Sequence, residues 1–140
     1  MTKYPIGVFI SGRGSNLKSI INASKDLNFP GEIRVVFSNN PGAKGLELAY
    51  ENNIDSISLD PNNFKDEKDF EEEILKLIDP YNLELVCLAG YMKILSKSFI
   101  EKFTGRIINI HPSLLPKYKG LNTHRRAIEN METVAGCTVH

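Results

Sequence analysis

The chain has 140 residues, of which 41% are apolar and 24% are charged, a length and balance typical of one globular domain with one core. Its 17 basic and 17 acidic residues cancel, so no overall field draws the protein to nucleic acid or to an anionic membrane, although a local anion site is compatible with this balance. We therefore predict a single domain over residues 1–140 that has no nucleic-acid partner and no membrane partner.

The cysteines and the first residues indicate the compartment. Cys87 and Cys137 lie in apolar stretches without CxxC spacing, which predicts two buried thiols rather than a disulfide, a redox pair or a metal site. Residues 1–5 lead directly into a strand-like segment, with no apolar stretch long enough for a signal peptide or a membrane span. We expect a reducing, cytoplasmic compartment.

Strand-like and helix-like segments alternate over the first 59 residues. Short runs of apolar and β-branched residues predict strands, apolar positions at helical spacing predict helices, and glycine, asparagine and proline mark the turns. In chain order, these segments are a strand over 6–10, a glycine turn over 11–14, a helix over 16–21, a strand over 31–38, a helix over 44–52 and a short strand over 57–59.

The alternation continues to the end of the chain. A helix is predicted over 66–78, with Phe70, Ile74, Leu77 and Ile78 on one face and its acidic residues on a solvated face rather than in a metal site. The remaining predictions are a buried strand over 85–89, a short helix over 96–103, a second buried strand over 106–110 and strand character over 134–140. Together the segments predict an α/β fold, an open, doubly wound and mostly parallel sheet with helices on both faces and ligands at the carboxyl ends of its strands.

A polar glycine loop follows the first predicted strand. Residues 11–16 read SGRGSN and lead into a helix, where free backbone N–H groups and the helix dipole favour an anion. The loop lacks both the full GxGxxG of dinucleotide binders and the GK[ST] ending of a P-loop, so a monophosphate fits better than a nucleotide cofactor. The alternative is that Gly12 and Gly14 only make a tight turn and that Ser15 caps the helix.

A second polar group follows the last buried strand, in the sequence NIHPSLLP over 109–116. Strand alternation places Asn109 and His111 on the same face, where the imidazole can transfer a proton and the amide can donate to an oxyanion. Alternatively, the histidine is structural and the two prolines only stiffen the loop. No metal is predicted, because His111, His124 and His140 match no zinc-ligand spacing, and no GxSxG motif supports a covalent route.

Five blocks of the sequence carry a resemblance to a known family. They are SGRGSNL over 11–17, LAGYMKIL over 88–95, NIHPSLLPKY over 109–118, GLNTH over 120–124 and GCTVH over 136–140. In order and spacing they resemble the glycinamide ribonucleotide (phosphoribosylglycinamide) formyltransferases, folate-dependent enzymes of purine synthesis. The resemblance implies a Rossmann-like formyltransferase fold and transfer of the formyl group of 10-formyltetrahydrofolate to the amine of glycinamide ribonucleotide.

The resemblance also implies roles for individual residues. The substrate phosphate would be held by Gly14, Ser15 and Asn16, the folate co-substrate by Met92, Lys93, Ile94, Leu95 and Asn109, and catalysis would rest on Asn109 and His111. Lys93 stands where the family more often has arginine, which keeps the charge and loses the planar fork. No metal is implied, and a homodimer is left open.

The chain departs from the family at its end. The family has a catalytic aspartate a few positions beyond the block that ends here at His140, whereas this sequence has no aspartate after Asp79. We expect that the C-terminal portion of the domain is missing and that this chain alone is poorly active. The alternatives are formyltetrahydrofolate deformylase, methionyl-tRNA formyltransferase or another formyl-folate enzyme, and a catalytically incomplete fragment that binds a phosphate ligand.

Overall fold

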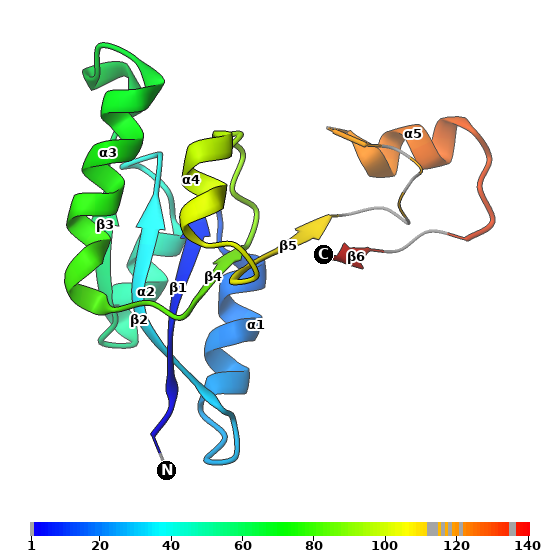
Figure 1. Ribbon diagram of the computed structural model, residues 1–140. Coiled ribbons are helices and arrows are strands. Elements are labelled where there is room, and N and C mark those ends of the chain that lie inside the picture. Colours follow the sequence, from blue (N-terminus) through cyan, green and yellow to red (C-terminus); the bar gives the residue numbers. More distant parts are fainter. Residues whose placement is uncertain (1, 112–114, 116, 118, 121, 135–136) are drawn as a thin grey trace. The chain divides into compact units, whose positions relative to one another are not determined.

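A computed structural model describes the whole chain except residues 1, 112–114, 116, 118, 121 and 135–136 (Figure 1). The chain forms two compact units, Met1–Ile107 and Ile108–His140. That the two units together form a single domain stays a prediction.

The first unit contains a parallel sheet of four strands in the order β3-β2-β1-β4 (Figure 1). β1 pairs with β2 on one side and with β4 on the other, and β2 pairs with β3, always in parallel. The carboxyl ends of all four strands therefore lie at one edge of the sheet. The strands are β1 (Tyr4–Ile10), β2 (Gly31–Ser38), β3 (Asp55–Ser58) and β4 (Leu85–Leu88).

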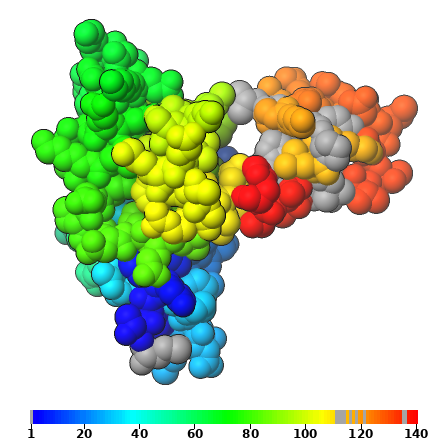
Figure 2. Space-filling model, in the orientation of Figure 1, coloured from blue at the N-terminus to red at the C-terminus, as the bar shows by residue number. Residues whose placement is uncertain are grey.

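Helices cover both faces of this sheet. Buried residues of α1 and α2 belong to one core cluster, and buried residues of α3 and α4 belong to a second. Figure 2 shows the face of this unit on which α3 and α4 lie. The helices are α1 (Ser15–Ser24), α2 (Gly45–Glu51), α3 (Glu67–Ile78) and α4 (Lys97–Lys102), with single 3-10 turns at Pro61–Asn63 and Asp79–Tyr81.

Burial on both faces explains why the central strands are apolar without interruption. In β1, Val8 faces the first cluster and Phe9 the second, and both side chains are fully buried. In β2, Arg34 has no partner in β1, and this irregularity puts Ile33 and Val35 on opposite faces although they are two residues apart. The predicted strands over 6–10 and 31–38 are confirmed.

The second unit holds a strand pair and a helix. β5 (Ile107–His111) runs antiparallel to β6 (Thr138–Val139), with His111 opposite Thr138. The helix α5 (Thr123–Glu129) was not predicted, because its only buried positions are Thr123 and Ala127, one turn apart, which is too little apolar periodicity to read. Among the described residues no helix is both long and apolar enough to cross a membrane.

Three predictions about single residues were wrong. Cys137 is exposed, since the strand beside it is only two residues long and covers little, whereas Cys87 is buried as expected. Glu71 of α3 is not on a solvated face: it is 6% exposed and its carboxylate is hydrogen-bonded within the protein. Leu77 is only half-buried and lies outside the core cluster, in which Leu75 takes part instead.

Candidate functional site

Ser11 connects the carboxyl ends of three neighbouring strands in the first unit. Its Oγ donates to Asn39 Oδ1 at 2.6 Å and accepts from the backbone N–H of Met92 at 2.8 Å. Its carbonyl oxygen accepts from Asn40 Nδ2 at 3.4 Å. Because Ser11 follows β1, the asparagines follow β2 and Met92 follows β4, one serine fixes the segments that leave the sheet at this edge.

The glycine loop is shaped by contact with the start of α2. Gly14 has φ +79°, in the left-handed region that favours glycine, and it precedes the first turn of α1. A Cβ on Gly14 would lie 2.9 Å from the Cα of Gly45. The N–H of Gly45 also donates to the carbonyl oxygen of Gly12 at 3.1 Å, so two elements meet here backbone to backbone.

The first turn of α1 presents free donors. In the part of the chain that the structure describes, no group accepts a hydrogen bond from the N–H groups of Ser15, Asn16 or Leu17, and the first bond of the helix runs from Lys18 N to Gly14 O at 2.8 Å. Ser15 and Asn16 are exposed, and neither Ser15 nor any other side chain caps the helix. The alternative that Ser15 is a helix cap is therefore wrong, and the geometry is that of an anion-accepting helix start.

The segment after β4 presents apolar side chains and free backbone groups together. Met92 and Ile94 are 63% and 86% exposed, whereas Leu95 is buried in the second core cluster. Lys93 Nζ lies 5.5 Å from the centre of the Phe70 ring, a cation–π contact that draws the cation toward α3. Within the described residues, the backbone N–H and C=O groups of residues 93–95 have no hydrogen-bond partner.

Both ends of that segment are packed against the first unit's core. The Tyr91 ring lies 5.5 Å from that of Phe9 and 6.1 Å from that of Phe37, and its buried hydroxyl has no described hydrogen-bond partner. Burial raises the pKa of the Tyr91 phenol, and the negative charge of Glu71 raises it further. Glu71 accepts from the N–H of Ser96 at 2.9 Å and, through its other oxygen, from the Ser96 hydroxyl.

In the second unit, Asn109 is held by His140. The Asn109 N–H donates to the His140 carbonyl at 2.6 Å and the His140 N–H donates back at 2.9 Å. The side-chain Nδ2 of Asn109 lies 3.2 Å from His140 Nε2, a hydrogen bond when that ring nitrogen carries no proton. Asn109 and His111 are two apart in β5, but the side chain of His111 and the loop residues 112–114 and 116 lie outside the described part.

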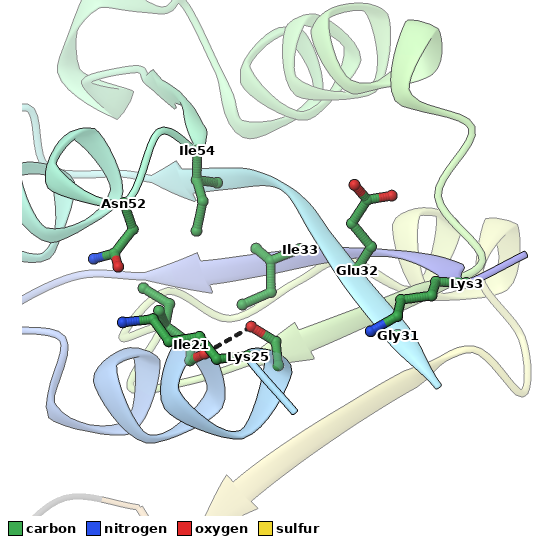
Figure 3. Close-up of a pocket in the computed structure, with 9 residues that line it drawn as sticks. Lys3, Ile21, Lys25, Gly31, Glu32, Ile33, Asn52 and Ile54 are labelled. Carbon is green, nitrogen blue, oxygen red and sulfur yellow. Dashed lines mark hydrogen bonds between the residues drawn. The ribbon is translucent and has the colours of Figure 1, made fainter. Parts of the chain in front are cut away.

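A pocket of about 350 Å³ lies at the other edge of the first unit's sheet (Figure 3). Its walls include Ile21, Ile33 and Ile54, with Lys3 and Lys25 beside them. It is built from the amino end of β2 and the last turn of α1, so none of the predicted site residues lines it. Ligands of such sheets bind at the carboxyl ends of the strands, which argues against this pocket as the main site.

The sequence profile of the formyl transferase family matches residues 5–140. Over 135 residues, the chain is 47% identical to the phosphoribosylglycinamide formyltransferase of Escherichia coli (strain K12), a match that covers 96% of this chain. The chain belongs to the formyl transferase family. It spans 64% of the length of that E. coli relative.

Two further proteins are similar to this chain. The chain is 40% identical over 138 residues to the human trifunctional purine biosynthetic protein adenosine-3, covering 99% of this chain and 14% of that protein. It resembles the crystal structure of phosphoribosylglycinamide formyltransferase from Brucella melitensis with a TM-score of 0.96 and 42% identity, covering 99% of this chain and 72% of that one. The predicted Rossmann-like formyl transferase fold is confirmed.

In the first unit, Ser11 joins the glycine loop to the segment after β4, the two segments in which binding residues were predicted. Ser11 was predicted only as the first residue of the glycine loop and was given no contact of its own, although its place directly after β1 was a usable signal. Nothing in the sequence indicated a special role for Glu71, because it is one of several acidic residues of α3. Only its contact with Ser96 in the structure distinguishes it from the others.

Proposed function

We propose that this protein transfers the formyl group of 10-formyltetrahydrofolate to the amine of glycinamide ribonucleotide, in the cytoplasm and as a step of purine (IMP) biosynthesis. One observation carries the proposal: the Met92 N–H, next to the free backbone groups of residues 93–95, donates to the hydroxyl of Ser11, which begins the loop that leads to the free N–H groups of α1. A phosphate and an extended heterocycle are the ligands that these two surfaces suit.

The phosphate of the ribonucleotide is assigned to Gly14, Ser15 and Asn16. The N–H groups of Ser15 and Asn16 have no described acceptor and lie at the positive end of the α1 dipole. The left-handed backbone of Gly14 turns the chain into that helix without a side chain in the way. The overall charge of the chain is zero, so this local geometry rather than a net field supplies the attraction.

The folate co-substrate is assigned to Met92, Lys93, Ile94 and Leu95, together with Asn109. Exposed Met92 and Ile94 offer apolar contact to a flat ring, and the unpaired backbone groups of the segment offer donors and acceptors to its polar edge. Lys93 supplies a point charge without the fork of an arginine. Leu95 contributes through its backbone, because its side chain is committed to the core.

Transfer is proposed to be direct. The substrate amine attacks the formyl carbon of the folate, and the carbonyl oxygen becomes the oxyanion of a tetrahedral intermediate. Asn109 donates to that oxyanion through its amide, and His111 stabilises it and moves a proton, so that the folate nitrogen leaves protonated as the intermediate collapses to the formamide. No metal, nucleic acid or membrane has a part in this proposal.

The test is a transfer assay with three proteins. We would compare the 140-residue chain, the same chain joined to the unmatched part of the E. coli relative, and the joined protein carrying His111→Ala. The joined protein should formylate glycinamide ribonucleotide, the variant should lose at least about a hundredfold in kcat, and the chain alone should be slow. Hydrolysis of the formyl donor without transfer would establish a deformylase, and phosphate-ligand binding without either reaction would establish a binding fragment.

A further inference from the structure

We propose that Ser11 and Glu71 are positioning residues that set the backbone of segment 91–96 from its two ends and thereby preform the edge on which the co-substrate binds. The inference rests on the proposed function only for the identity of that ligand. The anchoring itself is a property of the ligand-free protein and is tested separately.

Segment 91–96 has no regular secondary structure of its own. Before it, the Ala89 N–H donates to the Phe9 carbonyl in the continuation of the sheet, and after it α4 begins with the bond from Ile100 N to Ser96 O. Within segment 91–96 only two N–H groups are bonded to other described residues, and both are bonded to side chains: Met92 to Ser11 and Ser96 to Glu71. The hydrogen bonding of the segment therefore depends on two side chains, one directly after β1 and one in α3, rather than on a strand ladder.

At the first end, the Ser11 hydroxyl is fixed in direction. Its proton points to Asn39 Oδ1 at 2.6 Å, so a lone pair is left for the Met92 N–H at 2.8 Å. Asn39 belongs to the turn after β2, and Met92 belongs to the segment after β4. The hydroxyl therefore bonds to segments that follow two different strands. Removing the hydroxyl would leave the Met92 N–H and the Asn39 amide oxygen without this partner.

At the second end, the Glu71 carboxylate accepts both donors of Ser96. It is 6% exposed, and no lysine, arginine or histidine among the described residues forms an ion pair with it. The nearest cation on this segment, Lys93, is directed to the Phe70 ring instead. A buried carboxylate without a cation is costly, so its two bonds to Ser96 are what stabilise it there.

The Ser96 hydroxyl also connects Glu71 to the start of α4. Its Oγ accepts from the Phe99 N–H at 3.2 Å as the cap of that helix while it donates to Glu71. Glu71→Met removes both acceptor oxygens at a similar side-chain length, whereas an amide at position 71 could still accept the Ser96 N–H and donate to the Ser96 hydroxyl. Ser11→Ala and Glu71→Met therefore each release one end of the segment without altering the residues on the edge itself.

The first experiment measures amide hydrogen exchange by NMR in the ligand-free 140-residue chain. Ser11→Ala should speed exchange at Met92, and Glu71→Met should speed it at Ser96, each by about tenfold or more. The Ala89 amide is the internal reference and should not change. Unchanged exchange at Met92 and Ser96, or equal acceleration at Ala89, would overturn the proposal.

Two control variants change the same residue types at other positions of the first unit. Ser24→Ala removes a partly buried hydroxyl that donates to Ile21 O at 2.7 Å, at the far end of α1. Glu72→Met makes the same change at an exposed neighbour of Glu71 on α3. Both should leave the Met92 and Ser96 amides within about twofold of the parent.

The second experiment separates positioning from general stability in the joined protein described above. Both anchor variants should raise the KM for 10-formyltetrahydrofolate by about tenfold while kcat stays within about threefold, because they weaken the binding edge and not the reacting groups. If the joined parent is inactive, the proposed function fails and the exchange result still decides the anchoring. If exchange responds but this KM does not, positioning for the co-substrate is wrong although the enzyme is active.

Discussion

Gly14 and Gly45 meet with no side chain between them: a Cβ on Gly14 would lie 2.9 Å from the Cα of Gly45. Gly14 also has φ +79°, which costs an L residue about 1–2 kcal/mol. We therefore expect Gly14→Ala to lower the free energy of unfolding of the chain by at least about 1–2 kcal/mol, measured by urea denaturation.

The control for that variant is Gly12→Ala in the same loop. A Cβ on Gly12 would meet nothing within 4 Å, so its stability should stay within about 0.5 kcal/mol of the parent. Equal losses in the two variants would show that the close approach of Gly14 to α2 is not what constrains the loop.

Tyr91 carries a buried hydroxyl without a described hydrogen-bond partner. Because an unpaired buried polar group is destabilising by about 1–3 kcal/mol, Tyr91→Phe should leave the free energy of unfolding unchanged or raise it by up to that amount. The comparison is Tyr81→Phe, which removes a hydroxyl that donates to Asp55 Oδ2 at 3.0 Å and should not be stabilising. A clear loss of stability in Tyr91→Phe would mean that its hydroxyl has a partner in solution.

The buried thiol of Cys87 should make the free energy of unfolding depend on pH in the alkaline range. Burial raises the pKa of the Cys87 thiol from 9.0 to about 11, so between these values the folded chain keeps a proton that the unfolded chain has lost. This contribution to stability is complete below pH 9 and is lost as the pH rises through 11. Cys87→Ala should therefore flatten the fall of the unfolding free energy over that range, whereas Cys137→Ala, at an exposed thiol, should not.

Asn109 is predicted to donate to the oxyanion of the tetrahedral intermediate. Asn109→Ala in the joined protein should lower kcat by about 10²–10³-fold, the range for loss of one oxyanion donor. Asn130 of the same unit, whose amide donates to Arg126 O at 2.7 Å, provides the matched control, and Asn130→Ala should keep kcat within about threefold. A kcat that survives Asn109→Ala would remove this residue from the proposed mechanism.

Much of the fold could be predicted because its signals are local. The apolar runs of β1, β2 and β4 are those of strands buried on both faces, and all three lie where they were expected. The capping serine of α4 and the acids in the first turn of α3 mark helix starts in the sequence itself. The helix α5 was not predicted because it has only two buried positions, too few to give a detectable helical spacing of apolar residues.

The sequence alone determined that a polar glycine loop follows the first strand of a parallel sheet, since strand character and glycine turns depend on neighbouring residues. It could not determine that Ser11 bonds a residue 81 positions away, or that Glu71, among several acids of one helix, is the one turned inward to Ser96. Such partners are decided by strand order and by the packing of remote elements. Periodicity in the sequence indicates which residues are buried on average, whereas only the tertiary structure shows which atoms they contact.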